Sequence, residues 1–279
     1  MRISFTKMNG AGNDFVMIDN RDRSLALTPE DIQLICDRKR GVGADGAILV
    51  EPDEHSDFRM RYYNADGGEA EMCGNGARCV AHFAARRGIG VRSENQVKIT
   101  FVTKPGAMEA SVRGDRVTVA MTEAVGFERD VALDTENGVE TVHLINTGVP
   151  HAVALVDDWE YLTDEALLAR GRAIRKHEKF APAGINADFI RLREDGVIDI
   201  RTYERGVESE TLACGTGSVA AAVVADKLGL AASPIRLATR GGDVLEVSFY
   251  ASPGGAFGVT LQGPASVNFE GYLELDHEG

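Results

Sequence analysis

The sequence predicts an α/β (α+β) fold of two homologous lobes, each a mostly antiparallel sheet or barrel around a central helix. A length of 279 residues is most simply two domains. The motifs of the first half recur in the same order in the second half, which indicates an internal duplication. The helical segment after Cys214 carries no charge over residues 219–225, and such a helix has to be buried. We therefore expect two lobes related by an approximate two-fold axis.

The internal repeat consists of five matches, and the two members of each match lie about half of the chain apart. In chain order, the matched segments are residues 9–19 with 147–157, 28–32 with 163–167, 42–45 with 185–188, 69–77 with 210–218, and 103–106 with 239–242. The first match sets Asn13 against His151, and the fourth sets Cys73 against Cys214. Five matches in one order are hard to obtain by chance, so both halves are predicted to share one topology.

The same segments predict the secondary structure. The first and third matches are turns that lead into apolar strands. The second is a helix start in both halves, because a threonine cap precedes acidic residues that the helix dipole favours. The segments after the two cysteines are predicted as helices that end at residues 86–88 and 227–229, where cations and glycine stand. Alternating strands at 117–121 and 244–249 predict β-hairpins beside the fifth match.

The chain is expected to divide into a first lobe of residues 1–121 and a second lobe of residues 122–263. Residues 264–279 contain one more strand-like segment. This segment is expected to return to the first lobe.

Composition and charge exclude several classes of protein. Hydrophobic residues make up 44% and charged residues 26% of the chain, as in ordinary globular proteins rather than disordered or fibrous ones. A formal net charge of −13 disfavours nucleic acid and anionic membranes as partners. The chain has no stretch of about 18 apolar residues and no signal-peptide core, so we expect a cytoplasmic protein. Four cysteines are too few for a disulfide framework and are expected to be free thiols.

Two of the cysteines carry the candidate chemistry. Cys73 and Cys214 each precede a Gly-x-Gly motif at a predicted helix start. Unpaired backbone N–H groups and the positive end of the helix dipole lie there, so the pKa of each thiol is expected to fall below its usual value of about 8.5. A single cysteine is usually an inert small hydrophobe, and this is the interpretation for Cys36 and Cys79.

The residues after the two cysteines predict the ligand. Gly74 and Asn75 in one half, and Gly215 and Thr216 in the other, let a ligand approach the backbone, and helix N-termini favour a carboxylate. If the lobes bring both thiols to opposite faces of the neighbouring carbon, they can act as base and acid and invert a stereocentre. Backbone N–H groups can stabilise the carbanion-like transition state, so the reaction requires neither metal nor cofactor. The sequence contains no cluster of metal ligands and no nucleotide-binding fingerprint.

Taken together, these motifs resemble those of the diaminopimelate epimerase family over essentially the whole chain. The resemblance rests on GAGNDFV at residues 10–16, GVGADG at 41–46, MCGNGARC at 72–79, PH at 150–151, NADF at 186–189 and YERGVESETLACGTG at 203–217. It implies an isomerase without a cofactor that interconverts LL- and meso-2,6-diaminopimelate in bacterial lysine and peptidoglycan biosynthesis. It also implies a homodimer.

The resemblance implies a role for each matching residue. Cys73 and Cys214 are the thiol and thiolate pair, and His151 and Glu204 are the polar residues that activate them. Arg205 pairs with the distal carboxylate of the substrate, because a guanidinium fork can bind it bidentately. The implied substrate-binding residues are Asn13, Asn64, Gly74, Asn75, Asn186, Glu204, Arg205, Gly215 and Thr216. The sequence departs from the family pattern at two positions, Gly46 in place of Gln and Val149 in place of Asn.

Two other functions stay open. A related racemase or epimerase of the proline or hydroxyproline type would use the same thiol pair on another substrate. A thiol redox or ligand-binding protein would instead form a reversible disulfide between the two cysteines. The remaining charged residues of the first long helix, Arg78, His82, Arg86 and Arg87, are expected on its exposed side or at its end.

Overall fold

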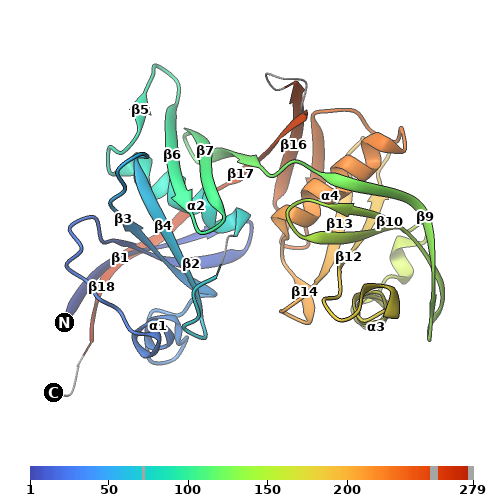
Figure 1. Ribbon diagram of the computed structural model, residues 1–279, viewed down its shortest axis with the longest axis horizontal. Helices are drawn as coiled ribbons and strands as arrows, with labels where there is room; N and C mark the ends of the chain where they lie inside the picture. Colours follow the sequence, from blue (N-terminus) through green and yellow to red (C-terminus); the bar gives the residue numbers. More distant parts are fainter. Residues whose placement is uncertain (71–72, 252–256, 276–279) are drawn as a thin grey trace. The chain divides into compact units, whose positions relative to one another are not determined.

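The structure is a computed structural model that describes residues 1–70, 73–251 and 257–275. The chain forms two compact units: unit 1 is Met1–Ala120 with Gln262–Gly279, and unit 2 is Met121–Leu261. The sequence places the corresponding divisions at residues 121 and 264. Both units combine several strands with two α-helices among their described residues, which confirms the predicted α+β class (Figure 1).

Unit 1 is built around a sheet of mixed direction. Its strands are β1 (Arg2–Gly10), β2 (Asn13–Asp19), β3 (Gly46–Glu51), β4 (Phe58–Asn64), β5 (Val91–Arg92), β6 (Val97–Thr103), β7 (Gly106–Arg113), β8 (Arg116–Met121) and β18 (Ser266–Glu274). Strand β1 is antiparallel to β18 and to β2, β2 is parallel to β3, and β3 is antiparallel to β4. Strand β4 is parallel to β6, which is followed by the antiparallel strands β7 and β8.

Unit 2 repeats this order of pairings. Its strands are β9 (Val125–Thr135), β10 (Gly138–Asn146), β11 (Pro150–Leu155), β12 (Asn186–Leu192), β13 (Ile198–Glu204), β14 (Ser209–Thr211), β15 (Ile235–Ala238), β16 (Val244–Ala251) and β17 (Phe257–Pro264), which ends in unit 1. Strand β10 is antiparallel to β9 and β11, β11 is parallel to β12, and β12 is antiparallel to β13. Strand β13 is parallel to β15, which is antiparallel to β16. The parallel and antiparallel pairs thus follow in the same sequence in both units, as the internal repeat predicts.

The shorter helix of each unit begins where its threonine cap predicts. Helix α1 (Pro29–Cys36) begins after Thr28, whose Oγ1 accepts a hydrogen bond from the Asp31 N–H at 3.2 Å, while the Asp31 carboxylate accepts from the Thr28 N–H at 2.9 Å. Helix α3 (Asp164–Arg175) begins after Thr163, whose Oγ1 accepts from the Ala166 N–H at 3.2 Å. These caps satisfy backbone donors that the first turn of a helix leaves unpaired.

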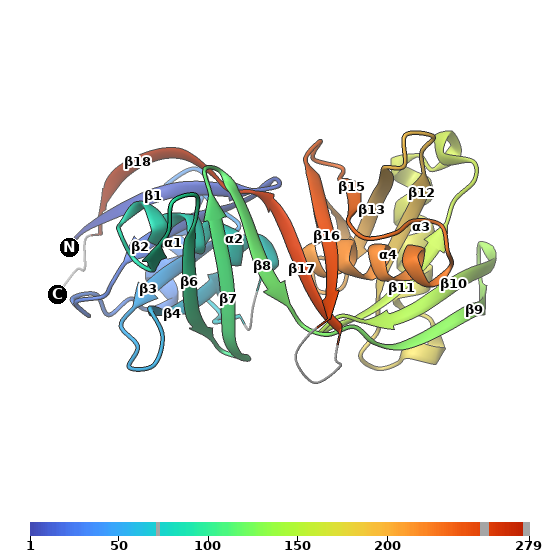
Figure 2. The same cartoon turned by 90° about the horizontal axis from the view of Figure 1, so that it is seen from above.

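The longer helix of each unit is central. Helix α2 (Gly74–Arg86) packs against β1, β2, β3, β6 and β7, and α4 (Gly215–Lys227) packs against β10, β11, β12, β13, β15 and β16. Each helix runs among the strands of its own unit, and the second view shows the same arrangement from above (Figures 1 and 2). Alanine and valine fill most of α4, so strands can approach it on every side. Among the described residues, no helix is both long and apolar enough to cross a membrane.

The expected exposure of Arg78 on α2 is wrong. Its side chain is fully buried, and its guanidinium donates to Asn75 Oδ1 at 2.7 Å and to the Gly74 carbonyl at 3.5 Å. These acceptors at the start of the helix replace water, which is why a cation can be buried at this position. His82 is half-buried with a ring nitrogen 2.5 Å from the Ala265 carbonyl, while Arg86 and Arg87 are exposed as expected.

Candidate active site

Both candidate cysteines are helix caps. Cys73 is the N-cap of α2, and its Sγ accepts a hydrogen bond from the Gly76 N–H at 3.5 Å. Cys214 is the N-cap of α4, and its Sγ accepts from the Gly217 N–H at 3.4 Å. The helix starts predicted directly after these cysteines are confirmed. Each sulfur therefore lies beside the unpaired backbone N–H groups of a helix start, an environment that favours a negatively charged group.

The glycine at the third position of α4 allows a close approach that shapes the surroundings of Cys214 in unit 2. A Cβ at Gly217 would lie only 2.5 Å from Asp188 Oδ1 and 3.2 Å from Thr202 Oγ1. Glycine is therefore required here, because these polar atoms belong to buried side chains of neighbouring strands. The first turn of α4 packs directly on Asp188 and brings this carboxylate close to Cys214.

The expectation that the helix start lowers the thiol pKa is wrong for Cys214. Burial raises the pKa of Cys214 well above its ordinary value, and the negative charges of Glu204 and Asp188 raise it further. Hydrogen bonds from Thr216 and from the Gly217 N–H lower the pKa, but they are smaller effects. Cys214 is consequently a protonated thiol at neutral pH when no ligand is bound.

Glu204 lies at the end of β13, where it can accept the proton of Cys214. Its Oε1 accepts a hydrogen bond from Thr211 Oγ1 at 2.5 Å, and its carboxyl is also hydrogen-bonded to the Cys214 thiol. Burial raises the pKa of Glu204, whereas these two hydrogen bonds lower it in part. A buried carboxyl group with a raised pKa next to a buried thiol is suited to exchange a proton with it.

The charge of Glu204 yields a prediction about the acidity of the thiol. In the Glu204→Gln variant, iodoacetamide is expected to alkylate Cys214 about three- to tenfold faster than in wild type at pH 8. Removal of a negative charge beside the sulfur favours the thiolate, which is the reactive form. Labelling of the Cys214 peptide, followed by mass spectrometry between pH 7 and pH 10, measures this rate. The control is Glu165→Gln, an exposed carboxylate on α3, which should leave the rate unchanged. An unchanged or slower rate in Glu204→Gln would contradict the electrostatic account.

His151 is held by a carboxylate that the sequence analysis did not identify as part of the site. His151 on β11 is fully buried, and its Nδ1 lies 2.7 Å from Asp188 Oδ2 on β12. The other oxygen of Asp188 accepts a hydrogen bond from Thr202 Oγ1 at 2.7 Å. A carboxylate accepts hydrogen bonds only, so this contact assigns the ring proton to Nδ1 and leaves Nε2 as the other functional nitrogen.

Asn186 connects His151 to the predicted carboxylate-binding arginine. Its Nδ2 lies 3.5 Å from His151 Nε2 and donates to the Pro150 carbonyl at 3.2 Å. Its Oδ1 accepts from the Arg205 N–H at 2.8 Å. Asn186 therefore positions the backbone of Arg205 as well as the imidazole. Among the ion pairs of the described residues, none involves the Arg205 guanidinium.

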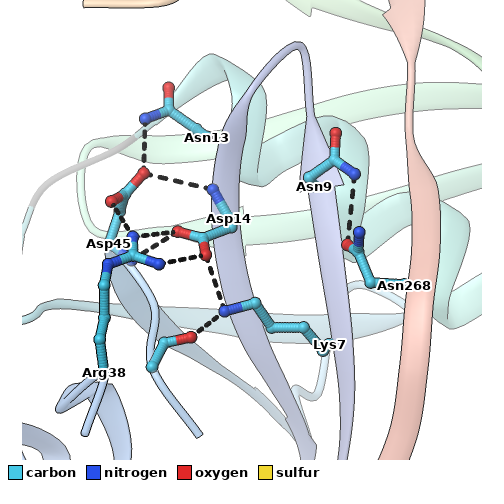
Figure 3. Close-up of polar contacts among 8 residues, drawn as sticks. Lys7, Asn9, Asn13, Asp14, Arg38, Asp45 and Asn268 are labelled. Carbon is cyan, nitrogen blue, oxygen red and sulfur yellow. Dashed lines mark hydrogen bonds and ion pairs between the residues drawn. The ribbon is translucent and has the colours of Figure 1, made fainter.

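Unit 1 brings together two of the predicted amides. Asn13, the first residue of β2, donates from Nδ2 to Asp45 Oδ2 at 3.0 Å (Figure 3). Its Oδ1 accepts from Asn75 Nδ2 at 2.5 Å, at the start of α2 directly after Cys73. Asn64 is exposed at the end of β4, and the described contacts of this residue involve its backbone.

The two units use matching residues in matching roles. The internal repeat aligns Asn13 with His151, and each of these side chains donates to an aspartate, Asp45 in unit 1 and Asp188 in unit 2. The same repeat aligns residues 42–45 with 185–188, so the two aspartates are equivalent. The two aspartates could therefore have been predicted from the repeat, because each is the last residue of the third match. From the sequence, these segments predict only turns.

The two departures from the family pattern have different surroundings. At Gly46, a Cβ would lie 2.4 Å from the Tyr63 carbonyl oxygen, so this backbone leaves no room for the glutamine of the pattern. Val149 is half-buried, and its carbonyl accepts from the Thr147 N–H at 3.1 Å. The chain therefore lacks the polar side chains that the family pattern has at positions 46 and 149.

The other two cysteines have the environment of inert thiols. Cys36 and Cys79 are buried, and burial raises the pKa of each to about 12. Such thiols stay protonated and react slowly. Within the described part of the chain, no group of three or more histidine, cysteine, aspartate or glutamate side chains is arranged to hold a metal ion.

Comparison with known protein families gives one match. Residues 5–126 and 143–257 match the family model described as diaminopimelate epimerase. Curated relatives named diaminopimelate epimerase include a protein of Hydrogenobaculum sp. (strain Y04AAS1), 42% identical over 97% of this chain and 98% of the relative. Another is the protein of Chlorobaculum tepidum, 40% identical over 96% of this chain and 100% of the relative.

Solved structures with the same fold are more distant in sequence. A probable proline racemase from Agrobacterium radiobacter K84 has a TM-score of 0.76 at 18% identity, and the match covers 98% of this chain and 93% of the other. A hydroxyproline epimerase from Agrobacterium vitis has a TM-score of 0.73 at 16% identity, with coverage of 99% and 94%. At this level of identity the similarity establishes the fold.

Proposed function

The chain belongs to the diaminopimelate epimerase family, and from this premise we propose that it interconverts LL- and meso-2,6-diaminopimelate through Cys73 and Cys214. As a member of this family the chain is an isomerase, and its proposed role is in lysine biosynthesis. The observation that carries the assignment of the residues is the pair of cysteine caps, each with its sulfur at the N-terminus of a buried helix.

The proposed reaction moves one proton off the α-carbon and another proton onto its opposite face. One cysteine, as thiolate, removes the α-proton, and the thiol of the other cysteine supplies the replacement. The electron pair left on the α-carbon is delocalised into the neighbouring carboxylate, where the charge increases. The backbone N–H groups of Gly74 and Asn75, and of Gly215 and Thr216, are proposed to stabilise this charge.

The surroundings of Cys214 support a specific role for Glu204. Because Cys214 is protonated at rest, it is poised as the proton donor in one direction of the reaction. In the other direction the thiol must first lose its proton, and the hydrogen-bonded Glu204 carboxylate is the group that can receive it. His151, fixed by Asp188, is proposed to serve as the second polar group that adjusts the protonation of the thiols.

The proposed substrate carries a second amino acid centre, and Arg205 is proposed to bind its distal carboxylate. The Arg205→Lys variant is expected to raise KM for LL-diaminopimelate about tenfold and to change kcat by less than about threefold, because the lysine retains the charge without the bidentate fork. Initial rates with both isomers measure the two constants. The matched control is Arg129→Lys, an exposed arginine of unit 2 that contacts only its neighbour Asp130 among the described salt bridges. A loss confined to kcat would contradict the binding role.

A substrate panel tests the proposed function as a whole. The reduced enzyme is expected to convert LL-diaminopimelate to the meso isomer and to leave L-proline and trans-4-hydroxy-L-proline unchanged. Chiral chromatography of the products distinguishes the three substrates. Turnover of either imino acid without turnover of diaminopimelate would replace the proposal with the alternative racemase.

The homodimer and the cytoplasmic location are proposed on family membership alone, and sedimentation velocity tests the dimer.

A further inference from the structure

A chain of four polar side chains runs through unit 1 beside Cys73. Asp45 Oδ2 accepts from Asn13 Nδ2 at 3.0 Å, Asn13 Oδ1 accepts from Asn75 Nδ2 at 2.5 Å, and Asn75 Oδ1 accepts from the Arg78 guanidinium at 2.7 Å. We name these four residues the amide relay. It begins at a carboxylate on the loop before β3 and ends at a fully buried guanidinium on α2.

The two charged ends give the relay a single direction. A carboxylate only accepts hydrogen bonds and a guanidinium only donates them, whereas the oxygen and nitrogen of an amide can exchange places by a flip. Asp45 therefore requires Nδ2 of Asn13 to face it, which turns Oδ1 of Asn13 toward Asn75. Arg78 requires Oδ1 of Asn75 to face it, which turns Nδ2 of Asn75 toward Asn13. Both amides are thus fixed by residues outside them.

The carboxylate end is itself held firmly. Arg38 donates to Asp45 Oδ1 at 2.8 Å and to both oxygens of Asp14, and Lys7 pairs with Asp14 at 2.8 Å (Figure 3). The Asp45 N–H donates to Asp14 Oδ1 at 2.9 Å, and the Asp14 N–H donates to Asp45 Oδ2 at 3.3 Å. Burial raises the pKa of Asp14, but the hydrogen bonds from Arg38 and Lys7 outweigh it and bring the pKa to about 2. Asp14, which accepts from Arg38 and from the Asp45 N–H, therefore stays charged throughout the neutral range.

The direction of the relay determines what Asn13 offers to a ligand. One N–H of its Nδ2 is used by Asp45, and its Oδ1 is used by Asn75. In the described part of the structure, the second N–H of this Nδ2 has no acceptor. Asn13 therefore presents a donor N–H, which suits an anionic acceptor such as a carboxylate.

We propose that Asp45 and Arg78 are positioning residues of the epimerase: they fix the amides of Asn13 and Asn75 so that Asn13 donates to a substrate carboxylate. The inference rests on the proposed function, which places Asn13 and Asn75 against the substrate. It adds Asp45 and Arg78, which do not touch the substrate. It also states that Asn13 is the donor, and the substrate carboxylate the acceptor, of their hydrogen bond. The hydrogen bond from Asn13 to the carboxylate is already made in the ground state, so we expect the relay to act on KM more than on kcat.

The Asp45→Asn variant tests the carboxylate end. It is nearly isosteric and still offers an oxygen to Arg38, but it no longer dictates which atom of Asn13 faces it. KM for LL-diaminopimelate is expected to rise about tenfold, with kcat within about threefold of wild type and an unchanged melting temperature. The matched control is Asp53→Asn, a carboxylate of the same unit that also accepts from backbone N–H groups and from an arginine, and it should leave both constants unchanged.

The double variant Asn13→Asp/Asp45→Asn separates positioning from a merely structural role. Position 45 can then donate to position 13, and Asn75 can still donate to position 13, so the hydrogen bonds within the relay are retained. The side chain at position 13 would now present an oxygen instead of a donor. We expect KM to rise further than in Asp45→Asn, at least about tenfold beyond it, while the melting temperature stays at that of wild type.

At the cationic end, Arg78→Lys retains a donor for Asn75, whereas Arg78→Met does not, so KM should increase less in the lysine variant.

An unchanged KM in Asp45→Asn, or recovery of the wild-type KM in the double variant, would overturn the proposal. Calorimetric titration of LL-diaminopimelate into Cys73→Ala backgrounds provides the same comparison without turnover. If the wild-type enzyme neither converts nor binds diaminopimelate, the proposed function fails. If it converts diaminopimelate and Asp45→Asn does so with the same KM, only the relay fails.

Discussion

Replacement of Cys214 by alanine is expected to lower kcat for LL-diaminopimelate by at least about a hundredfold, and Cys73→Ala should do the same. Each variant removes the only group proposed to exchange a proton on one face of the α-carbon, and such a group contributes about 10²- to 10⁴-fold. Both cysteines are helix caps whose sulfur accepts one backbone N–H, so loss of either cap costs only about 1 kcal/mol of stability. Formation of the meso isomer by chiral chromatography measures the effect.

The control for these variants is Cys79→Ala. Cys79 lies on the same helix as Cys73, is fully buried, and has a pKa raised to about 12 by its burial. Its replacement should lower stability through the small cavity that it leaves, while kcat stays within about twofold of wild type. Full activity in Cys73→Ala or Cys214→Ala would exclude the two-base mechanism. Strong loss in Cys79→Ala alone would indicate that the reactive thiol has been assigned to the wrong residue.

The Asp188→Asn variant is expected to lower kcat about a hundredfold while the protein stays folded. The amide can still accept from Thr202, but it no longer requires the proton of His151 to be on Nδ1. The wrong tautomer would leave Nε2 as a donor beside Asn186, and the imidazole would lose its role at the thiols. Removal of the Asp188 charge should also lower the pKa of Cys214, so the pH profile of kcat should shift toward acid.

A matched variant distinguishes this role from a structural one. Asp199 is likewise a buried carboxylate of unit 2, and it pairs with Arg191 and Arg193 away from the cysteines. Asp199→Asn should lower the melting temperature at least as much as Asp188→Asn, with little change in kcat or in its pH profile. Equal losses of kcat in the two variants would mean that Asp188 acts through stability alone.

Much of the fold could be predicted from the repeat, because the topology of each unit follows from local signals that occur twice. Threonine caps, acidic first turns and helix-ending glycines depend on neighbouring residues, and each of the predicted helices begins at its expected cap. The placement of both cysteines at helix starts is local in the same sense. These features needed no knowledge of which strands meet.

The rest of the site depends on contacts between segments that are distant in sequence. Asp188 and Glu204 reverse the expected shift of the Cys214 pKa, because a helix dipole is weaker than burial together with two carboxylates. Arg78 was expected to be exposed because it is charged, yet Asn75 provides a buried acceptor one turn earlier on the same helix. Burial and charge pairing of this kind appear only once the strands are assembled around the helix.

The central claim is that this protein removes and returns the α-proton of diaminopimelate with two cysteines, and exchange with solvent tests it most directly. The reduced enzyme is incubated with LL-diaminopimelate in D2O, and proton NMR follows the α-proton signal and the meso product. The account predicts that the α-proton signal declines as the meso isomer appears, and that Cys73→Ala and Cys214→Ala lose formation of the meso isomer. Formation of the meso isomer with full retention of the α-proton, or no reaction by a folded and reduced enzyme, would contradict it.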